Sequence, residues 1–216
     1  MRRCRLSGGL GLKLAASASR LGAVTVSLLT LPGVALAHGA IPGMGAFYTG
    51  LLHPLRVAGH LLALTGLALF MGQRRLFVSR HTLLAFMGGL LSGLSVLLYG
   101  PAWVGPLAEK ALLLLALGLG LAVATAHATP LRVNRWAIFL VAFAVIADSG
   151  QDGMASQQLF LANAGVVCGA TMLVANIGSL VQWIRPAWAL VGVRVVGSWV
   201  AAAALMVGAL MFRASA

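Results

Sequence analysis

The chain has 216 residues, of which 61% are hydrophobic and only 8% are charged, and its mean hydropathy is +1.00. A soluble domain carries roughly 25% charged residues, so this chain has too few charges to cover a water-facing surface. The composition therefore excludes an ordinary soluble protein and predicts an integral membrane protein. The formal net charge of +12 does not indicate nucleic-acid binding, because the basic residues lie in short gaps between apolar runs.

Residues 1–37 have the pattern of a secretory signal peptide. A basic segment precedes the apolar stretch from Leu21 to Val34, and Ala35-Leu36-Ala37 forms a small-x-small cleavage site. Cleavage there makes His38 the first residue of the mature chain, whereas the alternative is an uncleaved first helix. We predict a signal peptide over 1–37 and a single transmembrane domain over 38–216.

The rest of the chain divides into apolar runs, each close to the ~20 residues that a helix needs to cross a ~30 Å hydrocarbon core. Open sheet edges are excluded inside a bilayer, so these runs are expected to be helices. The predicted fold class is all-α, a polytopic transmembrane bundle of about six spanning helices after the signal peptide. The predicted spans are 46–72, 82–100, 108–128, 136–156, 158–184 and 187–212.

The basic residues indicate the orientation of the bundle. They gather in alternate breaks between the spans, whereas the breaks near 101–109 and 149–157 hold none. Lys and Arg keep loops in the cytoplasm, so we expect a multi-pass protein of the cell (inner) membrane whose mature N-terminus lies outside. The basic residues of these breaks are Arg74, Arg75, Arg80, Arg132, Arg135 and Arg185.

The fourth predicted span is too short to cross on apolar residues alone. The stretch from Trp136 to Ala147 covers only ~18 Å as a helix. Crossing therefore requires the helix to continue through Asp148 and Asp152, which would lie ~18 and ~24 Å from the cytoplasmic end, on one helix face.

The first span of the mature chain is also too short to cross the membrane on apolar residues alone. The apolar stretch from Leu61 to Gly72 must be extended by His60, Arg56 and His53 to cross, with His60 ~18 Å and Arg56 ~24 Å from Gly72. In an unbroken helix, His53 and His60 would be two turns or ~10 Å apart, too far to share one ion.

His60 and Asp148 are expected at one depth in the membrane, and Arg56 and Asp152 at another. These matching depths predict a polar cluster in the outer half of the bundle. Ionisable groups inside a membrane are costly unless paired or solvated, so they are functional candidates by default. An N-terminal His38 adds an amine and an imidazole, a chelate for a borderline metal such as nickel, copper or zinc. The candidate metal ligands are His38, His53, His60, Asp148 and Asp152.

Each candidate also has a structural interpretation. Arg56 and Asp152 can form an ion pair, His60 and Asp148 can form a hydrogen-bonded pair, and His53 can bond backbone groups that Pro54 leaves unpaired. The residues alone leave these alternatives open.

Other polar and small residues carry weaker expectations. Gly89 with Gly93 and Gly165 with Gly169 predict close helix packing. Arg194 is expected either to reach the cytoplasmic surface or to approach Asp148. We also expect Cys168 in the core and His81 and His127 at the cytoplasmic interface. Asn163 and Asn176 are expected in bonds across helices, with the lining of a path as the alternative.

Enzymatic chemistry finds no support in the sequence. No HExxH, CxxC, phosphate-binding glycine loop or Ser/His/Asp set stands out, and the whole chain has only 3 acidic residues. We therefore expect no enzyme, no catalytic residue and no tightly bound cofactor.

The segment from Ala37 to Gly72 resembles the HupE/UreJ family of hydrogenase and urease accessory membrane proteins. Family members begin after the signal peptide with Ala-His-x-Gly and continue to an HPxxGxDH motif. Here the chain has Ala37-His38-Gly39, and then His53-Pro54 and His60 at the matching positions.

This chain departs from the family pattern at three places. Val57 replaces the motif glycine, and Gly59 replaces the acidic residue. Where the family has a later histidine-rich segment, this chain has aspartates at Asp148 and Asp152. The aspartates gained on the later helix could compensate for the acidic residue lost at Gly59. The changes are equally compatible with a site that no longer binds metal.

The resemblance implies a permease or facilitator for a divalent transition metal, most of all nickel, which supplies metalloenzyme assembly. The expected partners are the lipid bilayer and the metal ion, with no nucleic acid; metalloenzyme maturation proteins or a second copy of the chain are the candidate protein partners. The alternative is a non-transporting accessory or scaffold protein whose buried polar residues are structural ion pairs.

Overall fold

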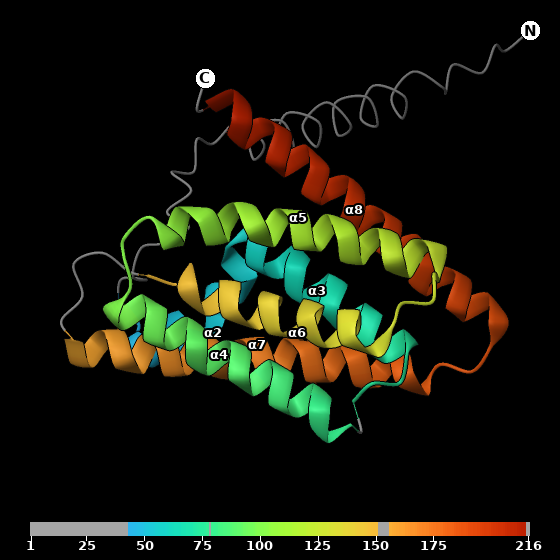
Figure 1. Ribbon diagram of the computed structural model, residues 1–216, viewed down its shortest axis with the longest axis horizontal. Helices are drawn as coiled ribbons and strands as arrows, with labels where there is room; N and C mark the ends of the chain where they lie inside the picture. The colour runs from blue at the N-terminus through green and yellow to red at the C-terminus, as the bar shows by residue number, and fades with distance from the viewer. Residues whose placement is uncertain (1–42, 78, 151–155, 215–216) are drawn as a thin grey trace, which may run out of the picture. The chain divides into compact units, whose positions relative to one another are not determined.

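The computed structural model describes residues 43–77, 79–150 and 156–214, and all regular secondary structure within them is helical. The predicted signal peptide, His38 and Asp152 lie outside these residues. Figure 1 shows the helices in chain order. They are α2 (Ala46–Arg56), α3 (Ala58–Gln73), α4 (Arg80–Tyr99), α5 (Val104–Thr125), α6 (Leu131–Ala147), α7 (Ser156–Trp183) and α8 (Ala187–Ala214).

The helices confirm the all-α fold class and suit a membrane protein. Four of them, α4, α5, α7 and α8, are long and apolar enough to cross a bilayer, and α2 with α3 counts as a fifth span if the bent pair is taken together. The remaining predicted span, the fourth, corresponds to α6, whose 17 residues cover only ~25 Å.

Helix α3 occupies the interior of the described bundle. It packs against α5 and α7, while α2 lies along α7, α4 along α6 and α8 along α5 (Figure 1). Leu64 and Leu67 of α3 and Val141 of α6 are completely buried. In contrast, α4 and α8 expose large apolar side chains such as Leu84 and Trp199, as expected of helices whose outer face meets lipid.

Glycines allow the closest helix contacts, as predicted for Gly89 and Gly165 and their partners four residues later. A β-carbon at Gly89 would lie 2.4 Å from the carbonyl oxygen of Phe139, and one at Gly165 would lie 2.1 Å from that of Phe47. Gly50 makes the same type of contact from the other side, because its β-carbon would lie 1.8 Å from the carbonyl oxygen of Ala162. The pairs α4–α6 and α2–α7 therefore pack backbone to backbone.

The first predicted span is not one unbroken helix, so the prediction of a continuous 46–72 helix is wrong. Val57 is extended, with φ −91° and ψ 116°, and α2 and α3 meet there at a bend of 73°. The extended region suits a β-branched residue, so valine is tolerated at the position where the family motif has glycine.

The prediction that the fourth span continues helically past Ala147 is also wrong. Helix α6 ends at Ala147, Asp148 is its C-cap, and Ser149 and Gly150 lie beyond the helix. Asp148 therefore ends a short helix and is not part of a longer one. Asp148 and Asp152 were expected on one face of a continuous helix. Asp148 does not lie within such a helix, and Asp152 is outside the described residues.

Replacing Gly50 by alanine should destabilise the bundle, because its methyl group would overlap the backbone of α7. We expect a loss of about 2 kcal/mol in the free energy of unfolding, a typical cost of overpacking. Gly118→Ala is the matched control, since nothing lies within 4 Å of a β-carbon there. It should be neutral or stabilising by up to ~1 kcal/mol. Unfolding in detergent would measure both, and equal stabilities of the two variants would contradict the close packing of α2 on α7.

Candidate functional site

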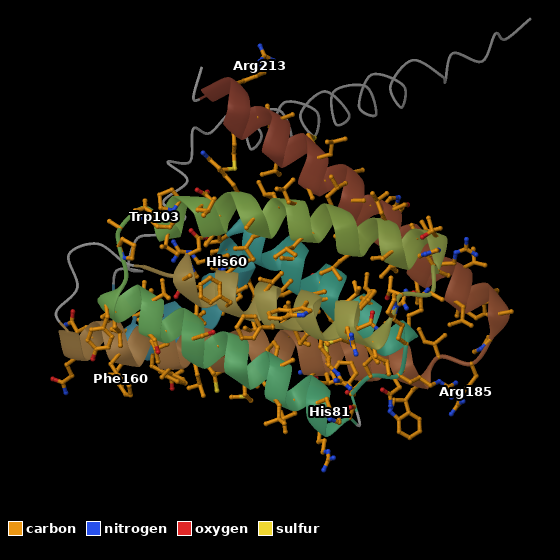
Figure 2. All side chains as sticks on the ribbon, in the orientation of Figure 1. His60, His81, Trp103, Phe160, Arg185 and Arg213 are labelled. Atoms are coloured by element: carbon orange, nitrogen blue, oxygen red, sulfur yellow. The ribbon has the colours of Figure 1, made fainter. Side chains whose placement is uncertain are left out.

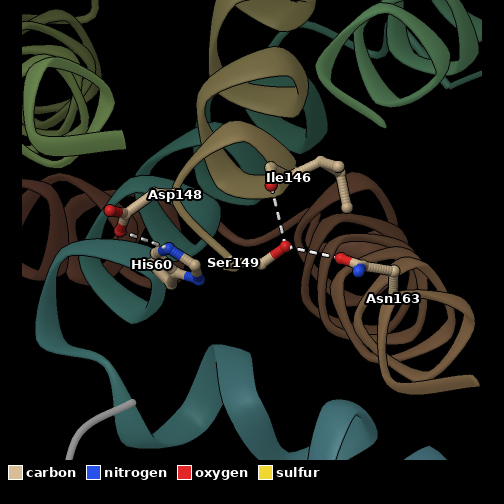
Figure 3. Close-up of polar contacts among 5 residues, drawn as sticks. All are labelled: His60, Ile146, Asp148, Ser149 and Asn163. Carbon is tan, nitrogen blue, oxygen red and sulfur yellow. Dashed lines mark hydrogen bonds and ion pairs between the residues drawn. The ribbon is translucent and has the colours of Figure 1, made fainter. Parts of the chain in front are cut away.

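A buried ion-pair-type contact joins α3 to the end of α6. His60 Nε2 donates a hydrogen bond to Asp148 Oδ2 over 2.9 Å, and the two side chains are 0% and 7% exposed (Figure 3). His60 lies in the first turn of α3 and Asp148 caps the last turn of α6, so both are at the helix ends opposite the basic loops. The contact that the matched depths of His60 and Asp148 predicted is therefore present.

The bend at Val57 brings His53 close to His60. The two imidazole rings are 4.9 Å apart between centroids and meet edge to face at 65°. The expected separation of ~10 Å was wrong because it assumed an unbroken helix. His53 is 1% exposed, so the two imidazoles and the Asp148 carboxylate form one buried group.

Helix ends influence the charge at this site. The C-terminus of α6 carries a partial negative charge, which disfavours a carboxylate on its cap residue. The N-terminus of α3 carries a partial positive charge, and Asp148 contacts its first turn through His60. The break at Val57 thus supplies a second helix end that offsets the unfavourable position of Asp148. Broken helices serve in this way at the ion sites of membrane transporters.

A second polar contact anchors the segment after α6 to α7. The Ser149 hydroxyl lies 2.7 Å from Asn163 Oδ1 and 2.8 Å from the carbonyl oxygen of Ile146, and its single proton can be donated to either (Figure 3). Asn163 donates its own amide to the carbonyl of Leu159 over 2.9 Å, which turns its oxygen toward Ser149. Ser149 is therefore held between two helices, and it fixes the backbone that carries Asp148.

The hydrogen bond to Asp148 selects a tautomer of His60. A carboxylate accepts the bond, so the proton of a neutral imidazole is on Nε2 and the lone pair is on Nδ1. Metal-binding histidines commonly donate their other ring N–H to a carboxylate, which fixes the ring and strengthens the ligand. The His60–Asp148 pair has the chemistry of that arrangement.

The structure brings together three of the five candidate ligands, His53, His60 and Asp148. The other two, His38 and Asp152, lie outside the described residues. Within the ranges that are described, no three His, Cys, Asp or Glu side chains are placed so that they could hold a metal ion together. Arg56 is half-buried at the end of α2, and its expected partner Asp152 is among the residues not described.

Several weaker predictions can be compared with the structure. Asn163 bonds across helices as predicted, but Asn176 donates to Met172 of its own helix, so that prediction is wrong. Cys168 is exposed on α7 and not in the core. Arg194 does not reach toward Asp148 but donates from Nε to the carbonyl of Ala124 over 2.8 Å, at the C-terminal end of α5.

Sequence reasoning missed Thr49, which is 1% exposed and lies one turn before His53 on α2. Its hydroxyl has no hydrogen-bond partner among the described residues. The four-residue spacing from His53 places both on one helix face and is the signal that could have identified it.

These features define an all-helical membrane bundle with a buried imidazole–carboxylate group near one end (Figure 2). The family model described as HupE / UreJ protein matches residues 26–207, so the chain belongs to the HupE/UreJ family. Neither the curated proteins nor the solved structures contain a match to this chain.

Removing one partner of the buried pair should cost more stability than removing both. His60→Leu leaves the Asp148 carboxylate buried without its donor, and we expect a loss of about 3 kcal/mol. The double variant His60→Leu with Asp148→Leu should be closer to the wild type, because an apolar pair of similar volume is often neutral.

Unfolding in detergent checks this expectation, with Thr171→Val as the control. Thr171 is exposed and bonds only within its own helix, so its loss should change little. Additive effects of the two site substitutions would contradict a coupled pair.

Proposed function

We propose that this chain is a permease or facilitator for a divalent transition metal, nickel above all, that supplies metalloenzyme assembly. One observation supports it most: in a HupE/UreJ family member, the bend at Val57 gathers His53, His60 and Asp148 in the buried part of the bundle. Imidazole and carboxylate ligands suit a borderline divalent ion, which is the cargo here and not a resident cofactor.

The proposed route enters from the outer side of the inner membrane, where we place the mature N-terminus. His38 would capture the ion, and His53 would pass it to His60 across the bend. Asp148 would hold the tautomer of His60 and, with Asp152, offset the positive charge of the ion. The short distance between the two imidazole rings makes a transfer within one site possible without an ordered water chain.

The described conformation is closed below the site. Ala63, Leu64, Leu67 and Ala68 follow His60 along α3 and are all 0% exposed. An ion can therefore pass inward only if α3 moves relative to α5 and α7. Movement of one part of a bundle against another around a central site is the general mechanism of secondary transporters.

Metal uptake by cells that lack the native gene tests the proposal. His60→Ala should abolish uptake, because it removes the central ligand, and Asp148→Asn should reduce it severalfold, because the ligand loses its charged partner. Isotope or mass-spectrometric measurement of nickel, cobalt and zinc identifies the ion. Normal uptake by both variants, at normal membrane levels, would reject the proposal.

The second candidate function is a non-transporting accessory or scaffold protein. The observation that favours it is that His60 and Asp148 satisfy each other, while no set of three metal-binding side chains exists within the described ranges. In that case the pair only holds α3 to α6.

The double variant His60→Leu with Asp148→Leu separates the two functions. A scaffold keeps its function when a buried pair is replaced by apolar residues of similar size. A permease loses uptake although the protein is stably inserted. Stable insertion combined with full metalloenzyme activity in the cell would therefore favour the scaffold.

A further inference from the structure

A polar pocket lies at the opposite end of the bundle from the histidine site. It is lined by Arg75 in the connection between α3 and α4, Gln182 and Trp183 at the end of α7, and Arg185 before α8. Figure 2 labels Arg185 at this end. Two guanidinium groups, an amide and an indole thus line one pocket, from the connection after α3 and from the end of α7 with the turn that follows it.

Arg75 occupies a backbone position that favours glycine. Arg75 N–H donates to Gly72 O over 3.2 Å and Leu76 N–H donates to Met71 O over 3.0 Å, the two bonds of a Schellman motif that ends α3. The residue at this position adopts a left-handed conformation, and Arg75 has φ 55°. Glycine is the usual residue because it adopts this conformation without strain. The strained arginine places a guanidinium at the pocket.

Other arginines near this end have structural partners. Arg74 donates to the carbonyl oxygen of His127 and stacks on Phe70, with its guanidinium 4.4 Å from the ring centroid. Arg194 bonds the end of α5. In the described part of the chain, the guanidinium groups of Arg75 and Arg185 take part in no hydrogen bond or ion pair.

The chain is poor in carboxylates, and none of the described residues brings one to this pocket. It contains only 3 acidic residues. Glu109 lies in the first two turns of α5 and Asp148 at the end of α6, both at helix ends opposite the basic loops, and Asp152 follows Asp148 by four residues in the sequence. Within the described residues, Arg75 and Arg185 therefore have no acidic partner, and their paired positive charges favour an anionic ligand.

We propose that this pocket binds the phosphate of an anionic phospholipid headgroup. Arginine forks bind phosphate oxygens bidentately, and basic pockets between membrane helices on the cytoplasmic side recognise anionic lipids. Trp183 favours a lipid over a free phosphate, because its side chain is 75% exposed at the end of a spanning helix, where tryptophans lie at headgroup level. The oxygen of the Gln182 amide is buried and has no hydrogen-bond partner in the described residues.

The test uses purified full-length protein in neutral detergent, titrated with phosphatidylglycerol or phosphatidylcholine and followed by native mass spectrometry. We expect phosphatidylglycerol to bind at least about tenfold more tightly than phosphatidylcholine. Arg75→Gly should weaken phosphatidylglycerol binding about fivefold to tenfold while the thermal midpoint rises, because the strain is relieved. A purely structural arginine would not produce this combination.

Two controls match this variant. Ala126→Gly relieves the same type of strain at the end of α5, where Ala126 has φ 52°, and should leave lipid binding within twofold. Arg132→Gln removes one charge at the same end of the bundle but outside the pocket, and should also have little effect. Arg185→Gln is the second variant of the pocket and should match the loss seen with Arg75→Gly.

Three results would overturn the proposal. Equal binding of the two lipids excludes recognition of the headgroup charge. An equal loss in Arg132→Gln shows that only the total charge matters. Displacement of phosphatidylglycerol by millimolar inorganic phosphate, with tight binding of phosphate alone, identifies a site for a soluble anion and not for a lipid.

Discussion

The hydrogen bond between His60 and Asp148 is the constraint on which this end of the bundle depends. Buried polar side chains are expensive in a hydrocarbon environment, so each must be satisfied by the other. The bond requires α6 to end at Ala147 and α3 to begin just before His60. Ser149 and Asn163 then hold the chain after α6 in place. The short α6 and the broken first span are therefore parts of one arrangement.

Composition and helix length were sufficient to predict the fold class and the most important contact. Apolar runs of near-membrane length predicted the helices, and the shortage of apolar residues in two of them predicted that His60 and Asp148 lie at the same depth. Their contact is then a consequence of helix packing. The glycine pairs predicted close helix packing, and the structure shows it between α4 and α6 and between α2 and α7.

The parts that could not be predicted depend on single backbone angles and on which helix face meets lipid. One extended residue, Val57, bends the first span, and valine in an apolar run carries no signal for a break. The C-terminal end of α6 at Ala147 was not predicted, because a span was expected to be long enough to cross the whole hydrocarbon core. Cys168 was misplaced because apolar residues are found on both the lipid-facing and the interior faces of membrane helices.

The contact between α2 and α7 has a consequence for the spacing of the two buried imidazoles. His53 belongs to a helix whose backbone rests on α7 at Gly50 and Gly165, whereas His60 belongs to α3, which also packs on α5. Only Val57 joins the two helices covalently. The separation of the imidazoles therefore depends on how α2 packs on α7 as well as on the bend at Val57. Under the proposed function, a change at Gly50, one turn from His53, would alter the spacing of the two imidazoles without replacing either one.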